Sequence, residues 1–278
     1  MIKRFEMAAK LSISILLLLL ICSRPCLSQD TVWQEIDKGI EVSRFKSPAA
    51  LVNPDITVLR INPALWDMKL ITRAQSEERF NLTAKEWCEK LNLTAAINAG
   101  MFHQDYVRHV GYLKTRDFVH DSLVNQYKSV AAFDPLMPDL PRFRMFDLDE
   151  CSVDSITRTY ATHVQNLRLI KRPGENRWQQ QEKKWSEAAL GEDSTGRILF
   201  IICRSPYSMY DLNEILLSLP IDLICAQHLE GGPEAQLYIR HNKTEIDLCG
   251  SFETGYAEND NNLQAWPIPN IIGITKKK

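Results

Sequence analysis

The sequence predicts a single domain of β-sheet with a few helices, in which one half of the fold is a mixed sheet. Three observations support this. Apolar and β-branched residues recur between Pro, Asn and Asp breaks, two helix starts carry capping residues, and one of these helices lies between two apolar strands. The 278 residues suffice for a sizeable core, and 45% hydrophobic and 24% charged residues are ordinary values for a globular protein.

The first half of the chain begins with a series of strands. Three are predicted in succession, at residues 35–45, 55–62 and 66–74. Thr83 followed by Glu86 forms a capping box, which opens a short helix over residues 84–92. A strand over residues 93–98 then leads into a glycine-containing turn.

The second half contains the strand–helix–strand unit. Ser208 with Asp211 predicts another capping box, and the helix that follows has an apolar face with the i, i+3, i+4, i+7 spacing, made by Leu212, Ile215, Leu216 and Leu219. It lies between the apolar stretches 197–204 and 221–229.

Two segments between these halves are interpreted as loops. Residues 135–143 contain three prolines. Residues 171–187 are polar and include Arg172, Arg177, Lys183 and Lys184. This polar segment is either a solvated insertion or a loop over a cleft that reaches for an anion.

The N-terminus has the pattern of a secretory signal peptide. A basic stretch precedes a 12-residue apolar run, "LSISILLLLLIC", and small residues allow cleavage after Ser28. The run is too short for an ordinary membrane-spanning helix. We therefore expect an exported, periplasmic or secreted protein, with a signal peptide at residues 1–28, one domain over residues 29–278 and no stable membrane insertion after cleavage.

Charge and cysteine content limit the partners, metals and cofactors that we expect for this protein. The formal net charge is −2, and no basic stripe is interleaved with aromatic residues, so a nucleic-acid partner is not expected. Five cysteines follow residue 28, and Cys203 and Cys225 lie in apolar runs where buried free thiols are usual. A disulfide framework among the others is left open. No cysteine or histidine cluster has zinc spacing, and we expect neither a metal nor a cofactor.

The stretch "IDLICAQHLEGGPEAQLYIR", residues 221–240, places acids at a tight reversal. A strand ends near Leu229, and Gly231 and Gly232 permit backbone conformations that a side chain would forbid. Glu230 then lies at a strand end, where active-site residues often gather. The alternative is that Glu230 and Glu234 are only surface carboxylates of a turn.

The stretch "AAINAGMFHQD", residues 95–105, has the same design. Its strand ends at Asn98 and turns at Gly100, which exposes His103. Asn98 offers a donor and an acceptor for sugar hydroxyls, and His103 could transfer protons. The alternative is that His103 is a loop histidine without a catalytic or binding role.

These segments resemble the phosphodiester glycosidase family. "INAGMF", "GYLK", "RILFIICRSPYSMYDLNEILLSL" and "LEGGPEAQLY" are similar to its successive signatures, in the same order, across roughly residues 35–275. The resemblance implies an α+β fold with mixed sheets flanked by a few helices. It also implies hydrolysis of a glycosyl phosphodiester, as in the family member that removes N-acetylglucosamine from a phosphodiester on mannose.

The chain departs from the family pattern in three places. The family usually has Asp-Gly-Gly and then a serine, whereas this chain has Glu230 and, near the serine position, Glu234. The family often places an arginine where this chain has Glu187. The loss of a cation with a gain of carboxylates weakens the case for an anionic substrate, whereas two carboxylates are what ordinary glycoside hydrolysis uses.

The resulting hypothesis is an exported glycosidase-like hydrolase that acts by general acid–base chemistry on a carbohydrate or glycosyl-phosphate substrate. The catalytic candidates are Glu230, Glu234 and His103. The substrate-binding candidates are Asn98, Gly100, Arg108, Lys114, Gln165, Gly231 and Gly232. Two alternatives stay open: a carbohydrate-binding descendant that has lost turnover, and a metal-dependent hydrolase that would use His103, Asp105, His109, His228 and Glu230.

Overall fold

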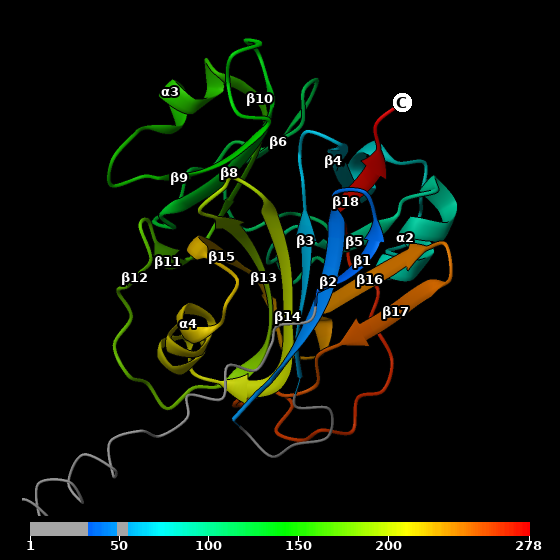
Figure 1. Cartoon of the computed structure of the whole chain (residues 1–278), viewed down its shortest axis with the longest axis vertical. Helices are drawn as coiled ribbons and strands as arrows, with labels where there is room; N and C mark the ends of the chain where they lie inside the picture. The colour runs from blue at the N-terminus through cyan, green and yellow to red at the C-terminus, as the bar shows by residue number, and fades with distance from the viewer. Residues whose placement is uncertain (1–32, 49–54) are drawn as a thin grey trace, which may run out of the picture. The chain divides into compact units, whose positions relative to one another are not determined.

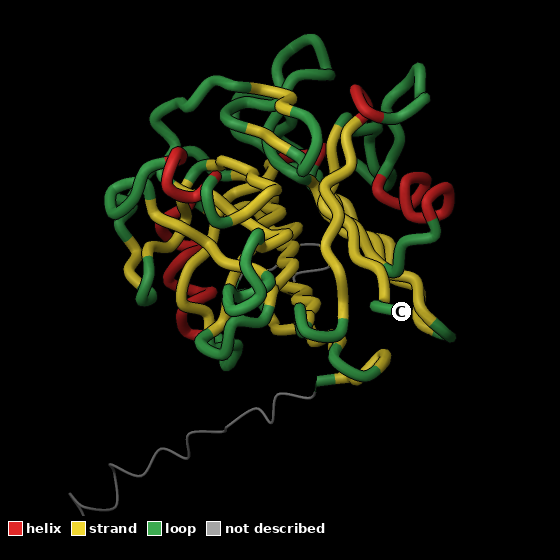
Figure 2. Tube along the Cα trace, turned by 90° about the horizontal axis from the view of Figure 1, so that it is seen from above, coloured by secondary structure: helices red, strands yellow, loops and turns green. Residues whose placement is uncertain are grey.

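The computed structural model describes residues 33–48 and 55–278, so the expected signal peptide lies outside the described residues. Three β-sheets form the body of this part of the chain, and the helices lie at its periphery (Figures 1 and 2). The helices are α2 (Ala84–Leu91), α3 (Val153–Thr157) and α4 (Met209–Ser218), with short 3-10 turns η1 (Arg73–Gln75) and η2 (Gly232–Glu234). The α+β class and the single domain are confirmed. No described helix is long and apolar enough to cross a bilayer.

The largest sheet has eight strands. In spatial order they are β1 (Gln34–Asp37), β2 (Ile40–Lys46), β3 (Asp55–Ile61), β14 (Ile198–Tyr207), β13 (Trp185–Asp193), β15 (Leu223–Gly231), β11 (Arg168–Lys171) and β12 (Glu175–Asn176). The stretch predicted as one strand over residues 35–45 is instead the hairpin β1–β2. Gly39 supplies the turn, with φ +82°, a backbone conformation that favours glycine.

The other two sheets have five strands each. One contains β7 (Val119–Asp121), β6 (Leu113–Lys114), β10 (Tyr160–Asn166), β8 (Ser129–Pro135) and β9 (Phe143–Asp147). The other contains β17 (Thr244–Cys249), β16 (Gln236–His241), β5 (Ala95–Asn98), β18 (Asn270–Lys276) and β4 (Trp66–Thr72).

Strand direction differs from the expectation of mixed sheets. The strand–helix–strand unit is present as β14, α4 and β15, but β13 lies between the two strands and pairs antiparallel with both. Every pairing between the described strands is antiparallel. The helical crossover therefore skips a strand instead of creating a parallel pair.

The core has one central part and three smaller ones. The central core joins side chains of all three sheets, including Leu59, Ile97 and Phe133. A second core packs the eight-stranded sheet against α4, a third packs α2 on β5 and β16, and a fourth packs α3 on β8 and β10. Figure 1 shows α2 and α4 beside these strands. This burial is the main source of stability.

Capping residues begin both helices, and one of the two predicted capping boxes is complete. Thr83 accepts from the Glu86 amide, and the Glu86 side chain accepts from the Thr83 amide, which is a complete capping box. Ser208 accepts from the Asp211 amide at 3.1 Å. Asp211 in turn accepts from the Ser208 hydroxyl instead of the backbone, so the second box is only half formed.

Candidate functional site

The glycine turn after β15 is a tightly packed corner. Gly232 has φ +61°, and a Cβ at this position would lie 2.7 Å from Oε2 of Glu253. Both facts exclude a larger residue without rearrangement. The turn η2 follows at once, so Glu230 and Glu234 flank the corner and Glu253 packs on it.

Asn98 joins the two predicted turns. Its Nδ2 donates to the carbonyl of Glu234 at 2.9 Å, and its Oδ1 accepts from the amide of Gln236 at 2.8 Å. The side chain is buried. The structure thus brings the end of β5 and the 230–235 turn together. The amide of Asn98 is engaged with the backbone, so its observed task is to hold the turn.

Three carboxyl groups at this corner bind protons more tightly than usual. Burial raises the pKa of Glu230 to about 8, against the opposing charge of His228 and the hydrogen bond from the Gly231 amide, and the charges of Glu234 and Glu253 raise it by smaller amounts. Burial also raises the pKa of Glu234 to about 7 and raises the pKa of Glu253. At neutral pH, Glu230 is mostly a neutral carboxylic acid, which can donate a proton.

A β-bulge sets the direction of Glu230. Glu230 pairs with Ala188 and His228 pairs with Ala189, which leaves Leu229 as the extra residue of β15. Ala188 belongs to the central core and Ala189 to the core against α4. Glu230 and His228 therefore lie on opposite sides of the sheet, although a regular strand would place both on one side.

His228 forms a buried pair with Glu187 of the neighbouring strand β13. Its Nδ1 lies 2.7 Å from Oε1 of Glu187, and the indole nitrogen of Trp185 donates to Oε2 at 2.8 Å. Burial alone would lower the pKa of His228, but the charge and hydrogen bond of Glu187, together with Glu230 and Glu253, raise it. Burial also raises the pKa of Glu187, against the opposing charge of His228.

A loop from the β7–β9 sheet completes the surroundings of Glu230. Burial and then the charge of Glu230 raise the pKa of Tyr127, which lies in this loop. Gln165 on β10 holds this loop. Its Nε2 donates to the carbonyls of Asn125 at 3.2 Å and Tyr127 at 2.7 Å, and its Oε1 accepts from the Tyr112 amide at 2.9 Å. Gln165 is fully buried and shapes the site through its neighbours.

The other predicted site residues lie in the loop that follows β5 or beyond it. Gly100 packs against Asn166 and His109, with no space for a side chain. Arg108 is exposed and paired with Asp105 through a 2.5 Å contact. Lys114 donates to the carbonyl of Ala161 at 2.8 Å.

His103 is partly exposed, and its ring makes no hydrogen bond to any described residue. Its backbone closes the loop, because the His103 amide donates to the carbonyl of Arg108 at 2.8 Å.

The donor groups named for the metal alternative do not form a ligand set. In residues 33–48 and 55–278, no three His, Cys, Asp or Glu side chains are arranged to hold a metal ion. His109 is buried and bonds the carbonyl of Gln165 at 2.9 Å. All five cysteines after residue 28 are free, and Cys203 and Cys225 are buried as expected.

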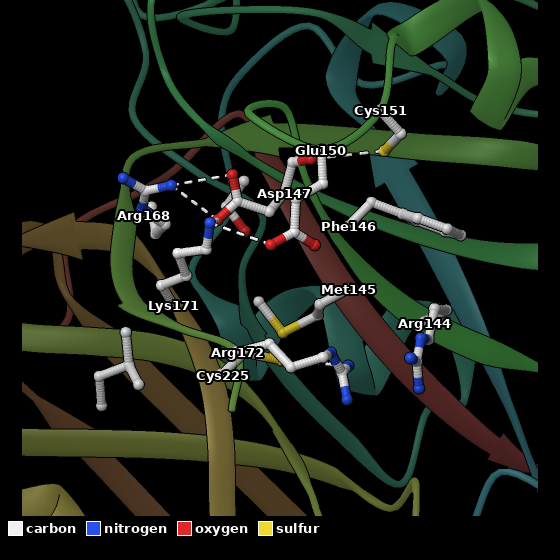
Figure 3. Close-up of a pocket in the computed structure, with 12 residues that line it drawn as sticks. Arg144, Met145, Phe146, Asp147, Glu150, Cys151, Arg168, Lys171, Arg172 and Cys225 are labelled. Carbon is white, nitrogen blue, oxygen red and sulfur yellow. Dashed lines mark hydrogen bonds and ion pairs between the residues drawn. The ribbon is translucent and has the colours of Figure 1, made fainter. Parts of the chain in front are cut away.

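A separate charged pocket lies between β9, β11 and β15 (Figure 3). Arg168 contacts Asp147 at 2.6 Å and Lys171 contacts Glu150 at 2.9 Å. Arg172 contacts Glu192 at 2.6 Å. Each cation thus has an acidic partner. Arg172, expected in a loop that could reach an anion, is held by the protein itself.

Comparison with known proteins identifies the family. A sequence profile of the phosphodiester glycosidase family matches residues 91–275, two thirds of the chain. The chain belongs to the phosphodiester glycosidase family. No curated protein matches the sequence.

Two solved structures share the fold of this family member. A hypothetical protein from Synechocystis has a TM-score of 0.60 and 10% identity, over 90% of this chain and 64% of that one. The catalytic domain of zebrafish N-acetylglucosamine-1-phosphodiester alpha-N-acetylglucosaminidase, auto-inhibited by its pro-peptide, has a TM-score of 0.58 and 12% identity, over 90% of this chain and 85% of that one.

Sequence reasoning missed two features of the site in this phosphodiester glycosidase. Glu253 is one of them, and its position in a polar loop offers no signal. The pairing of Glu187 with His228 was also missed, although a signal exists. His228 lies in the apolar stretch 221–229, and a buried ionisable group requires a partner.

Proposed function

We propose that this protein is an exported glycosidase-like hydrolase that cleaves a glycosyl phosphodiester or a related glycoside. Membership in the phosphodiester glycosidase family supports a hydrolase that acts on a carbohydrate-type substrate. The observation that carries the proposal is the Glu230 carboxyl, which stands at the end of β15 with its pKa raised to about 8. The proposed export depends on the signal-peptide pattern of residues 1–28.

In the proposed reaction, Glu230 is the general acid. It gives its proton to the leaving-group oxygen while the bond from that oxygen to the anomeric carbon breaks. Glu234, with a pKa of about 7, is placed at the same turn and is the candidate to accept a proton from the attacking water. Because Glu230 must be protonated to act, activity should fall as pH rises through about 8.

The test is Glu230→Gln, measured on the methyl phosphodiester of N-acetylglucosamine 1-phosphate and on 4-nitrophenyl N-acetylglucosaminides. We expect kcat to fall by about 10²–10⁴-fold, the usual contribution of general acid–base catalysis. The matched control is Glu77→Gln, since Glu77 is exposed and makes no hydrogen bond or ion pair to the described residues. An active Glu230→Gln enzyme with an unchanged pH profile would contradict the assignment. An inactive wild-type protein that still binds the sugar would favour the non-catalytic descendant.

A further inference from the structure

Four aromatic side chains form a chain of contacts beside the carboxylate corner. The ring centroids of Phe102 and Tyr106 lie 5.4 Å apart, and those of Tyr256 and Trp266 lie 6.4 Å apart. Burial, then the charge of Glu234 and then Tyr106 raise the pKa of the Tyr256 phenol, which places Tyr106 and Glu234 in its surroundings. We call these four residues the aromatic row.

The aromatic row is open to solvent. Tyr106 is 47% exposed, Tyr256 57% and Trp266 36%. Such exposure of large rings in a contiguous set is unfavourable in water and often marks a binding site. Tyr and Trp combine an apolar face with a polar edge, which suits a ligand that is apolar on one face and polar on its rim.

The row is tied to the same turn that carries the acids. Tyr256 follows Glu253 in a tight turn, in which the Tyr256 amide donates to the Glu253 carbonyl at 3.1 Å. The Trp266 indole donates to Asn262 at 3.2 Å, and the Trp266 carbonyl accepts from Gln236 at 2.7 Å. The row therefore borders the corner instead of lying at a remote surface.

Tyr106 also has a strained backbone. Five non-glycine residues of the described chain have positive φ, and four of them are Asn or Asp, which tolerate this region. The fifth is Tyr106, with φ +56°. A bulky residue held in this conformation costs free energy that glycine would avoid, and such strain is typical of functional sites.

We propose that the aromatic row is a saccharide-binding platform, on which the C–H face of a pyranose ring stacks next to the carboxylates. This inference rests on the proposed glycosidase function and adds a binding site to it. The substrate would then be a glycan, or a glycoside with at least one sugar beyond the residue at Glu230. Ring hydroxyls would remain at the rim, exposed to water.

The test separates binding from turnover by using the Glu230→Gln background. Chitotetraose is the probe, and its dissociation constant is measured by calorimetry and by the change in tryptophan fluorescence. Tyr256→Ala and Trp266→Ala should each weaken binding about 2- to 10-fold, the range for removal of one aromatic contact. Tyr256→Phe and Trp266→Phe keep a ring and should bind nearly as well. The control is Phe118→Ala, since Phe118 is 48% exposed and packs on His120 instead of the row.

Tyr106→Gly provides a second, sharper test. Removal of the ring should weaken binding of chitotetraose, while relief of the positive φ should leave the melting temperature unchanged or raise it. The proposal is overturned if chitotetraose does not bind, or if it binds equally well to the alanine variants and to wild type. If binding depends on the rings but the wild-type protein hydrolyses none of the glycosides, the platform stands and the proposed hydrolase fails.

Discussion

The raised pKa of Glu230 makes a specific prediction about stability. In the folded protein this carboxyl keeps its proton up to about pH 8, whereas in the unfolded chain it ionises near the ordinary value of 4.5. Between these two values the unfolded state binds fewer protons, so stability falls as pH rises. Glu230→Gln cannot ionise, and it keeps an oxygen to accept the 3.1 Å hydrogen bond from the Gly231 amide. The variant should therefore lose this part of the pH dependence.

The magnitude follows from the size of the shift. A shift from 4.5 to about 8 is roughly three and a half pKa units, and each unit corresponds to about 1.4 kcal/mol, which sets an upper limit near 5 kcal/mol. Glu230 retains some contact with solvent, which screens the effect. We expect Glu230→Gln to be more stable than wild type by about 1–3 kcal/mol at pH 8.5, and by much less at pH 5.

Urea denaturation of both proteins at pH 5 and pH 8.5 measures this difference. Glu77→Gln serves again as the control, and it should follow the wild-type curve at both pH values. Glu234 and Glu253 remain in the variant, so a residual decline with pH is expected. If the wild-type protein and Glu230→Gln lose stability in parallel between pH 5 and 8.5, Glu230 is not a buried, protonated acid. The argument for its role as a general acid would then fail.

Three further substitutions test the packing around the site. Glu187→Ala leaves buried His228 without its partner and should lower the free energy of unfolding by about 3–5 kcal/mol; NMR titration should show the pKa of His228 falling. Gly232→Ala places a Cβ against Glu253 at positive φ and should cost more than about 1 kcal/mol in chemical denaturation. Ser208→Ala removes an N-cap and should lower stability by about 1 kcal/mol without changing activity.

Local features of the fold were accessible from the sequence because they depend on neighbouring residues. The cap at Thr83 and the end of a strand near Glu230 follow from short-range spacing, and both are confirmed. The strand order of the sheets depends on which distant segments meet. The insertion of β13 between β14 and β15, which made the predicted mixed sheet antiparallel, has no local signature.

The site shows the same division between local and distant information. The glycine turn was visible as a motif, but the partner of His228 lies 41 residues earlier, on another strand. The bulge at Leu229 is equally hidden, since it depends on the register between β13 and β15. Regular alternation would have placed His228 and Glu230 on one side of the sheet and would have suggested a direct bond between these two residues. In the structure His228 pairs with Glu187 instead.

The bulge changes how the acidic departures from the family pattern are understood. Glu187, where the family resemblance leads one to expect arginine, is bound by His228 and Trp185 on the side of the sheet facing α4. Its charge is therefore balanced inside the protein and is not presented with that of Glu230. The acids left at the corner are Glu230, Glu234 and Glu253, all with raised pKa values. Protonation of Glu230, and in part of Glu234, lowers their repulsion toward a phosphodiester near neutral pH, so the missing arginine alone does not exclude an anionic substrate. The affinity for an anionic substrate should instead depend on pH. As these carboxyls ionise, an anionic substrate should bind progressively more weakly than a neutral glycoside.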